Sequence, residues 1–270
     1  DIQRLGAIVS KTTTLLPRAG SPVQRIDETP AGMLNSIGLQ NVGMAVLKRD
    51  LAPVWARWKV PIIVSILGST VEEYGECAAA LDRVEGVAAL ELNISSPNAQ
   101  KGGMEFGQDP AVAAAVTAAC VRATQLPVIV KLTPNVTSIV DVARRVVDAG
   151  AGALCCINTL QAMSIDVRTR KPRIARTFAG LSGPAIKPVA LRMVWQVCGA
   201  VDVPVIGCGG ITTATDALEF LMAGATAVQV GTATFRDPLT PLRVLDGIEA
   251  YMRDEGISHI REIIGAARPA

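Results

Sequence analysis

Short apolar runs rich in β-branched residues alternate along this chain with longer stretches in which apolar residues recur at helical spacing. The runs with the length and composition of buried strands are residues 6–9, 61–67, 87–94, 127–132, 152–157, 204–207 and 226–231. The stretches with helical periodicity are residues 71–84, 110–124, 138–149, 187–200, 214–223 and 238–254. Residues that favour helix starts and stops agree with these boundaries: Thr70, Asp109-Pro110, Gly150 and Gly224.

Strands that alternate with helices at this spacing predict a parallel sheet, and so many repeats predict a closed (β/α)8 TIM barrel. The seven runs leave such a barrel one strand short. The sequence begins Asp1-Ile2-Gln3-Arg4 without methionine, so we expect the first strand and its helix, about 30 residues, to be missing. Residues 1–270 are therefore predicted to form a single barrel domain truncated at its N-terminus. An open, doubly wound sheet needs no eighth strand and stays an alternative.

Composition narrows the classes of function. The chain is 50% hydrophobic but only 3% aromatic, which predicts one large aliphatic core. A net charge of +2 predicts neither nucleic-acid binding nor an acidic membrane partner, and no uncharged apolar segment reaches the ~20 residues of a membrane span. The six cysteines lie in apolar segments without C-x-x-C spacing or a recognisable secretory leader, which indicates reduced thiols in a cytoplasmic protein. The single histidine, His259, lies far from the motifs below, so we expect neither histidine catalysis nor a metal site.

Polar side chains follow the apolar strand of residues 87–94, where α/β folds place their ligands. Residues 91–98 read Glu-Leu-Asn-Ile-Ser-Ser-Pro-Asn. The amides of Asn93 and Asn98 can together hold a planar amide or carboxylate ligand in one orientation. A simple asparagine-capped turn is the structural alternative. The next residues, 100–107, contain three glycines and are either a lid over a ligand or a plain surface loop.

Two late strands run directly into glycine. Gly209 and Gly210 follow the strand of residues 204–207, and Gly231 ends that of residues 226–231. Glycine lets backbone N–H groups approach an anion, and the loops after the last two strands of TIM barrels frequently bind phosphate. Either loop alone is equally consistent with a tight turn, but the two together favour a phosphorylated cofactor.

Two lysines lie at strand ends. Lys11 follows the first run, and Lys131 lies inside an otherwise aliphatic strand. A lysine in that position must reach a partner or lose hydration, and two ammonium groups at a barrel mouth would stabilise negative charge on a flavin or a substrate. Lys11 stands at a strand end and can alternatively extend its ammonium to solvent. Lys131 lies inside the strand, so this alternative fits it poorly.

Five motifs, in this order at strand ends, resemble the class 1 dihydroorotate dehydrogenases, and most of all the catalytic subunit of their NAD-linked, two-subunit branch. The motifs are Lys11-Thr12-Thr13-Thr14; residues 32–41; residues 93–98 with the glycine-rich residues 102–107; Ile157-Asn158-Thr159-Leu160; and residues 180–188. The resemblance covers nearly the whole chain. Each motif alone is weak evidence, but their order along one barrel is specific.

The resemblance implies the cofactor, the substrate and their binding residues. It implies FMN, bound by Lys11, Thr12, Asn93, Lys131, Ile157, Gly183, Gly209, Gly210, Gly231 and Thr232. It implies a dihydroorotate site formed by Lys11, Asn35, Ser36, Ile37, Gly38, Leu39, Asn93, Asn98, Asn158 and Thr159. Asparagines suit a flat ring edged with imide N–H and C=O groups. Oxidation to orotate then needs a base for the C5 proton and a hydride transfer from C6 to the flavin.

The base position departs from the class 1 pattern, because Ser96 stands where class 1 enzymes carry cysteine. Serine is the choice of the membrane-linked class 2 enzymes, but residues 183–193 match the NAD-linked branch. A serine hydroxyl is a much weaker acid than a thiol, so Ser96 needs a proton relay through water, Ser95 or Thr133. Ser96 and Lys131 are the expected catalytic residues.

The chain has no dinucleotide-binding fingerprint, so NAD is not expected to bind to it. By resemblance, electrons leave through a separate subunit that carries FAD and an iron–sulfur cluster, and the barrel itself forms a homodimer. Activity without that subunit, with fumarate or a quinone as acceptor, is an alternative. Two other functions stay open: a flavin-binding subunit that is impaired or non-catalytic, and an FMN enzyme acting on another pyrimidine.

Overall fold

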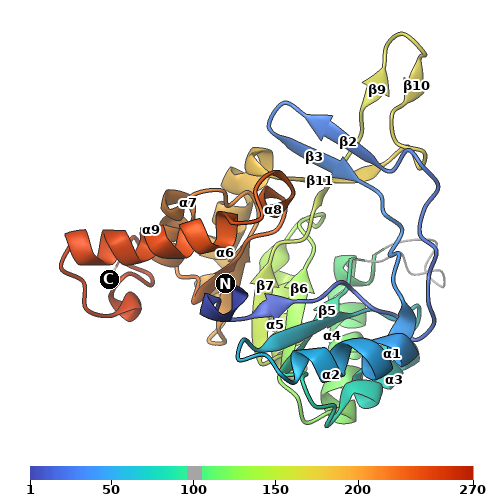
Figure 1. Ribbon diagram of the computed structural model, residues 1–270, viewed down its shortest axis with the longest axis horizontal. Helices are drawn as coiled ribbons and strands as arrows, with labels where there is room; N and C mark the ends of the chain where they lie inside the picture. The colour runs from blue at the N-terminus through green and yellow to red at the C-terminus, as the bar shows by residue number, and fades with distance from the viewer. Residues whose placement is uncertain (96–104, 270) are drawn as a thin grey trace. The chain divides into compact units, whose positions relative to one another are not determined.

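The structure is a computed structural model that describes residues 1–95 and 105–269. The chain forms two compact units, each containing two chain segments (Figure 1). The first unit comprises Asp1–Gly20 and Gly38–Cys155, and the second comprises Ser21–Ile37 and Cys156–Ala270. We describe them separately.

The first unit is built around parallel strands in the order β1-β4-β5-β6-β7. The strands are β1 (Ile8–Val9), β4 (Ile62–Ile66), β5 (Ala89–Asn93), β6 (Val128–Leu132) and β7 (Ala153–Cys156). The pairs β1–β4, β4–β5 and β5–β6 are parallel, with Asn93 opposite Lys131 at the end of the last pair. The five predicted strands in this part of the sequence are confirmed.

The two faces of β5 and β6 differ in chemistry. Because side chains alternate along a strand, Leu90 and Leu92 share one face of β5, while Glu91 and Asn93 share the other. On β6, Val130 and Leu132 are fully buried and alternate with Lys131. One face of the sheet is therefore aliphatic, and the other carries charged and amide groups toward the carboxyl ends of the strands.

Three helices follow the strands of this unit: α3 (Val71–Leu81), α4 (Pro110–Ala123) and α5 (Ile139–Asp148). Helix α4 packs against both α3 and α5. The Thr70 side chain accepts the Glu73 N–H at 3.2 Å, and Asp109 accepts the first free N–H groups of α4 after Pro110. The start residues predicted from the sequence are thus confirmed.

The helical stretch between Gly43 and Trp55 was not predicted. It consists of α1 (Gly43–Val46), the π-helical turn η2 (Leu47–Leu51) and α2 (Ala52–Trp55). Pro53 has no N–H and cannot form a regular α-helical hydrogen bond, which agrees with the wider turn before it. The interruption explains why this stretch lacks a long helical periodicity.

The second unit contains the last two predicted strands and three predicted helices. Strands β12 (Val205–Cys208) and β13 (Ala227–Gln229) are parallel. The helices are α6 (Lys187–Cys198), α7 (Ala214–Met222), the short α8 (Ala233–Arg236) and α9 (Thr240–Asp254). Leu218, Leu221 and Ile263 form a buried cluster that joins α7 to the C-terminal segment.

An antiparallel sheet in the second unit was not predicted. Its order is β2-β3-β11-β8, with β2 (Ile26–Thr29), β3 (Gly32–Asn35), β11 (Ala179–Ser182) and β8 (Leu160–Ala162). A hairpin of β9 (Ile165–Asp166) and β10 (Lys171–Pro172) extends beyond β2 and β3 in Figure 1. These strands are only two to four residues long, so period-two patterning gives little signal. Short 3₁₀ helices complete the described chain: η1 (Ile2–Arg4), η4 (Phe106–Gln108), η5 (Pro184–Ile186) and η6 (Ile260–Glu262).

Asp216 holds the start of α7. Its Oδ2 atom accepts the N–H and hydroxyl groups of both Thr212 and Thr213, while Lys187 Nζ lies 2.7 Å from its Oδ1. Lys187 Nζ also lies 3.0 Å from Glu219. Burial raises the pKa of Asp216, but the hydrogen bonds from Lys187 and Thr212 outweigh it and hold this pKa well below the usual range.

We expect Asp216→Asn to lower the free energy of unfolding by about 2–4 kcal/mol at neutral pH, because a buried network loses its charged acceptor. The folded-state pKa is depressed, so this stabilisation is present above the unfolded pKa of about 3.9 and declines as pH falls toward the folded value. Urea unfolding should therefore show a difference from wild type at pH 7 that narrows at acid pH. The exposed Asp254→Asn is the matched control, and an equal effect of the two substitutions would contradict this role.

The described residues contain neither a disulfide nor a membrane-spanning helix. All six cysteines lie within them, and none forms a disulfide. Burial raises the pKa of the Cys77 and Cys120 thiols to about 12, which keeps both protonated at neutral pH. No described helix has the combined length and apolar composition needed to cross a membrane. The His259 Nδ1 atom accepts the Arg261 N–H at 3.1 Å and caps η6.

Candidate active site

Three polar side chains meet at the carboxyl ends of β1, β4 and β5. Thr12 and Asn93 are predicted site residues, and Ser65 is their neighbour. The hydroxyls of Thr12 and Ser65 are 2.8 Å apart, and Asn93 Nδ2 donates to Thr12 Oγ1 at 3.2 Å. Thr12 and Ser65 are buried. These contacts orient the amide of Asn93, which both the turn pattern and the resemblance select as a ligand-binding group.

Asn93 is also held through its other atoms. Its Oδ1 accepts the Ser95 N–H at 3.2 Å, and the buried Tyr74 hydroxyl donates to its backbone oxygen at 2.6 Å. Thr12, Tyr74 and Ser95 thereby fix the end of β5. Ser96 and Asn98, predicted to be the base and a substrate ligand, lie outside the described residues, as does most of the predicted lid.

Lys131 pairs with a buried carboxylate. Its Nζ lies 3.5 Å from Glu91 Oε1, and the exposed fractions of the two side chains are 18% and 2%. Burying either charge without an oppositely charged partner would be energetically costly. The carboxylate of Glu91 therefore holds the Lys131 ammonium in place. The structure therefore places Lys131 on the polar face of the sheet beside Asn93. Glu91 was not predicted as part of the site, although it stands two residues before Asn93 on the same face.

Lys11 follows β1 in the same unit. Crowding by protein atoms lowers the pKa of its ammonium through desolvation. Such a shift makes the group more sensitive to a nearby anion, because a bound negative charge would raise the pKa again.

The predicted substrate segment from Asn35 to Leu39 crosses from the second unit to the first. Asn35 Nδ2 donates to Gly180 O at 3.3 Å, and the Ser36 N–H is bonded to Arg25 O. Gly38 and Leu39 both have positive φ, of 72° and 58°. A leucine in this region is uncommon, and Asn41 accommodates it by donating to Leu39 O at 2.8 Å.

In the second unit, Thr159 lies against β11, next to Asn158 in the sequence. Asn158 Oδ1 accepts the Thr159 N–H at 2.9 Å. A Cβ atom added to Gly180 would collide with Thr159 Oγ1, so the absence of a side chain at Gly180 allows this approach. The structure therefore brings Asn35 and Thr159 to the same residue of β11.

The predicted cofactor glycines form close backbone contacts. Gly209 and Gly210 have positive φ, and added Cβ atoms would lie 3.6 Å from Ile157 Cγ1 and 2.8 Å from Lys187 N, respectively. An added Cβ at Gly183 would lie 3.5 Å from Thr232 Cγ2. Ile157, Gly209 and Gly210 are thus neighbours, as are Gly183 and Thr232. A Cβ added to Gly231 would have no described atom within 4 Å apart from its chain neighbours, so the space there is open.

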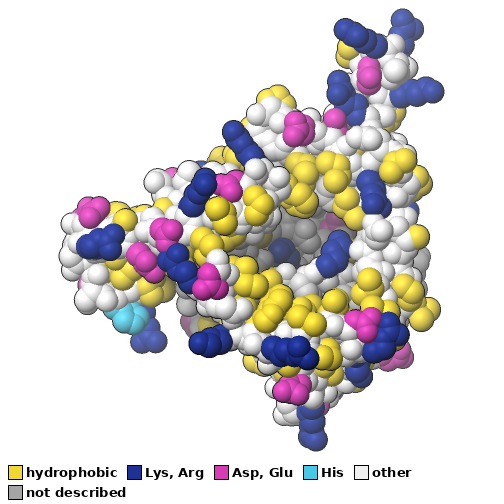
Figure 2. Space-filling view, in the orientation of Figure 1, with side chains coloured by type: hydrophobic (Ala, Val, Ile, Leu, Met, Phe, Trp, Pro, Cys, Tyr) yellow, Lys and Arg dark blue, Asp and Glu magenta, His cyan; other side chains and the backbone are white. Residues whose placement is uncertain are grey.

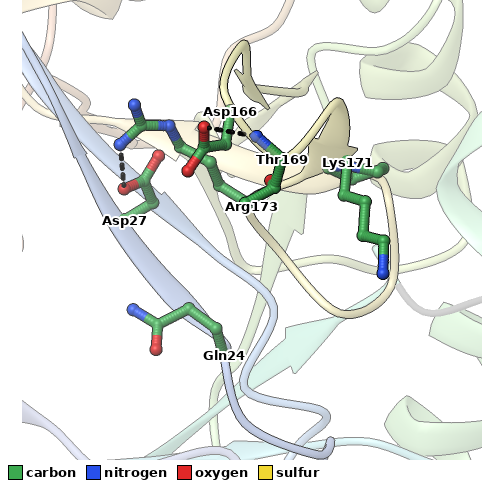
Figure 3. Close-up of a pocket in the computed structure, with 7 residues that line it drawn as sticks. Gln24, Asp27, Asp166, Thr169, Lys171 and Arg173 are labelled. Atoms are coloured by element: carbon green, nitrogen blue, oxygen red, sulfur yellow. Dashed lines mark hydrogen bonds and ion pairs between the residues drawn. The ribbon is translucent and has the colours of Figure 1, made fainter.

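A separate cavity of about 390 Å³ lies at the β9–β10 hairpin and contains none of the predicted site residues (Figure 3). Its lining includes Gln24, Asp27, Asp166, Thr169, Lys171, Pro172 and Arg173. In Figure 3 the Arg173 guanidinium points to Asp27, and the Thr169 amide points to Asp166. Lys and Arg side chains gather on this hairpin in Figure 2. The expectation from net charge missed this cluster because a whole-chain sum averages it away.

The model of the dihydroorotate dehydrogenase family matches residues 1–252 of this chain. The chain belongs to that family. The catalytic subunit of dihydroorotate dehydrogenase B (NAD(+)) from Pelobacter propionicus is 55% identical over 266 residues, covering 98% of this chain and 88% of the relative. The protein of the same name from Desulforamulus reducens is 56% identical over 267 residues, covering 99% and 88%.

Membership of the dihydroorotate dehydrogenase family confirms the predicted fold class, because the family fold is the TIM barrel. The alternative of an open doubly wound sheet is thereby set aside. The family is one of flavin enzymes, and the relatives are named as catalytic subunits, which implies a second subunit in those enzymes. No group of three or more His, Cys, Asp or Glu side chains within the described ranges could hold a metal ion.

Proposed function

We propose that this chain, as one FMN-binding domain, oxidises dihydroorotate to orotate in de novo pyrimidine biosynthesis. The observation that carries the proposal is the row of polar groups at the ends of β1, β5 and β6. Thr12, Asn93 and Lys131 stand there on one side of an otherwise aliphatic sheet, in a chain of this family. Ligands of TIM-barrel enzymes bind at this end of the strands.

The residues present fit a flavin that carries a phosphate. Gly183, Gly209 and Gly210 have positive φ, and the lack of a side chain lets their backbone N–H groups approach an anion. The open space at Gly231 leaves room for part of the cofactor. The proposed FMN-binding residues are Lys11, Thr12, Asn93, Lys131, Ile157, Gly183, Gly209, Gly210, Gly231 and Thr232. When bound, FMN supplies the hydride acceptor of the reaction.

The chain's own groups orient the substrate and move its proton. We propose that Lys11, Asn35, Ser36, Ile37, Gly38, Leu39, Asn93, Asn98, Asn158 and Thr159 bind dihydroorotate. Amide side chains match its alternating N–H and C=O groups, and the ammonium of Lys11 suits its carboxylate. Ser96 takes the C5 proton, and Lys131, held by Glu91, stabilises the negative charge that develops.

Anaerobic mixing of the purified protein with dihydroorotate tests this function. Bleaching of the flavin absorbance supports it, because the substrate must pass a hydride to the cofactor. An oxidised spectrum that does not change would indicate a non-catalytic flavin protein. Reduction by another dihydropyrimidine, but not by dihydroorotate, would correct the substrate.

The electron acceptor is proposed to be NAD, reached through a second subunit with FAD and an iron–sulfur cluster, in an assembly with two copies of each chain. The names of the relatives, which call them catalytic subunits, support this partner. We also propose that the protein is cytoplasmic, since its six cysteines are free thiols. An iron–sulfur cluster needs several cysteine thiolates, and the described residues contain no such group.

We therefore expect dihydroorotate:NAD oxidoreductase activity only after co-expression with the second subunit. The isolated chain should reduce its flavin with dihydroorotate but should not reduce NAD at a significant rate. Both preparations are assayed spectrophotometrically for NADH formation at matched flavin concentration. Rapid NADH formation by the isolated chain would contradict the partner requirement while leaving the dehydrogenase function intact.

A further inference from the structure

A buried hydrogen bond joins Glu105 to the end of β6. The Thr133 hydroxyl donates to Glu105 Oε2 at 2.7 Å, and Thr133 is 1% exposed. The same oxygen of Thr133 accepts the backbone N–H of Asn135 at 3.3 Å and its Nδ2 at 3.2 Å. Since a hydroxyl has one hydrogen, the ionised Glu105 determines where that hydrogen points.

Glu105 also holds the described residues that follow the proposed base. It caps η4 in a capping box with Gln108, and the Gly107 N–H donates to Ile94 O at 2.8 Å. A Cβ added to Gly107 would lie 3.0 Å from Ile94 Cδ1 and 3.1 Å from Thr133 Cγ2. The Glu105–Thr133 pair therefore lies beside the strand end that leads to Ser95 and Ser96.

Thr133 comes directly after β6 (Val128–Leu132) in the sequence. It stands two residues beyond Lys131, at the carboxyl end of the same strand. Lys131 is the residue proposed to stabilise charge on the reacting groups. The hydroxyl fixed by Glu105 thus lies at the end of the strand that carries Lys131.

Three titratable groups on or next to neighbouring elements have partners of their own. Lys131 on β6 pairs with Glu91, and Asp109 accepts N–H groups at the start of α4. Tyr74, in edge contact with Phe106, donates its hydroxyl to Asn93 O. Burial raises the pKa of Glu105, and hydrogen bonds from Thr133 and Asn135 oppose the shift. Its titration therefore lies above that of an ordinary glutamate.

We propose that Glu105 is a positioning residue for the proposed oxidation, in which its ionised carboxylate fixes the Thr133 hydroxyl and its protonation reverses that hydrogen bond. This inference rests on the proposed function. When Glu105 is protonated, it becomes the donor and Thr133 must turn its own hydrogen elsewhere. The hydrogen bonds at the end of β6 then change, and proton abstraction slows.

The test is the pH dependence of flavin reduction by dihydroorotate, measured by anaerobic stopped flow on the complete FMN-loaded protein. We expect the wild-type rate to fall at acid pH as Glu105 takes up a proton. Glu105→Gln keeps an acceptor oxygen but cannot ionise, so this acid limb should disappear. Its rate at high pH should fall about tenfold, the size expected for one disturbed hydrogen bond, while KM changes less.

Two further variants separate positioning from folding. Thr133→Val should flatten the profile as Glu105→Gln does, whereas Thr133→Ser retains the hydroxyl and should restore the wild-type profile. Glu85→Gln, an exposed glutamate elsewhere in the same unit, is the matched control and should behave as wild type. A wild-type acid limb that persists unchanged in Glu105→Gln would overturn this inference alone. No flavin reduction by dihydroorotate in the wild type would instead overturn the proposed function with it.

Discussion

Replacing Lys131 with alanine should slow flavin reduction by dihydroorotate by about 10²–10³-fold, the range for losing one preorganised group that stabilises a transition state. The ammonium lies on the polar face of the sheet, 3.5 Å from Glu91 and opposite Asn93 in the strand register. Its position is fixed before the substrate binds, so little reorganisation is needed when charge develops. Anaerobic stopped-flow measurements at saturating dihydroorotate report the effect directly.

The same substitution should also destabilise the fold, because Glu91 is almost completely buried. Removing one partner of a buried ion pair typically costs about 3–5 kcal/mol. A double variant, Lys131→Met with Glu91→Gln, removes both charges and should recover most of the stability without recovering the rate. Activity that returns together with stability would show that Lys131 acts on folding and not on the reaction.

The parallel strands and their helices could be predicted because their signals are local and strong. Buried strands such as β5 and β6 are continuous aliphatic runs, and helices such as α4 begin with Asp-Pro and have apolar residues at helical spacing. Each pattern follows from which face of the element is buried.

The antiparallel sheet and the helical stretch around Pro53 could not be predicted in the same way. Strands β2, β3, β8 and β11 are short, and their partners are far apart in the sequence; β3 pairs with β11 across more than a hundred residues. Their stability comes from tertiary pairing and from a small cluster around Leu34, not from a local pattern.

For the candidate site, the residue types could be predicted but their partners could not. Lys131 stood out as a cation inside an aliphatic strand, yet Glu91 was hidden because a single acid in a strand is normally solvent-facing. Glu105 was hidden too, since its contact with Thr133 depends on how residues after the loop return to β6. Spacing along the chain carries no information about such contacts.

Replacing Ser96 with alanine should reduce dihydroorotate-driven flavin reduction by about 10²–10⁴-fold, the usual contribution of a general base, while leaving FMN bound. The hydroxyl serves proton transfer, and the proposed flavin contacts come from other residues, so the absorbance spectrum of the oxidised protein should not change. Ser96→Cys tests the chemistry further: a thiol ionises more readily than a hydroxyl, so activity should be kept or raised with its pH profile shifted downward. Glu85→Gln, at an exposed position of the same unit, is the control and should keep the wild-type rate. A rate equal to wild type would mean that another group accepts the C5 proton. Loss of FMN from Ser96→Ala would mean that Ser96 contributes to cofactor binding and not to proton transfer alone.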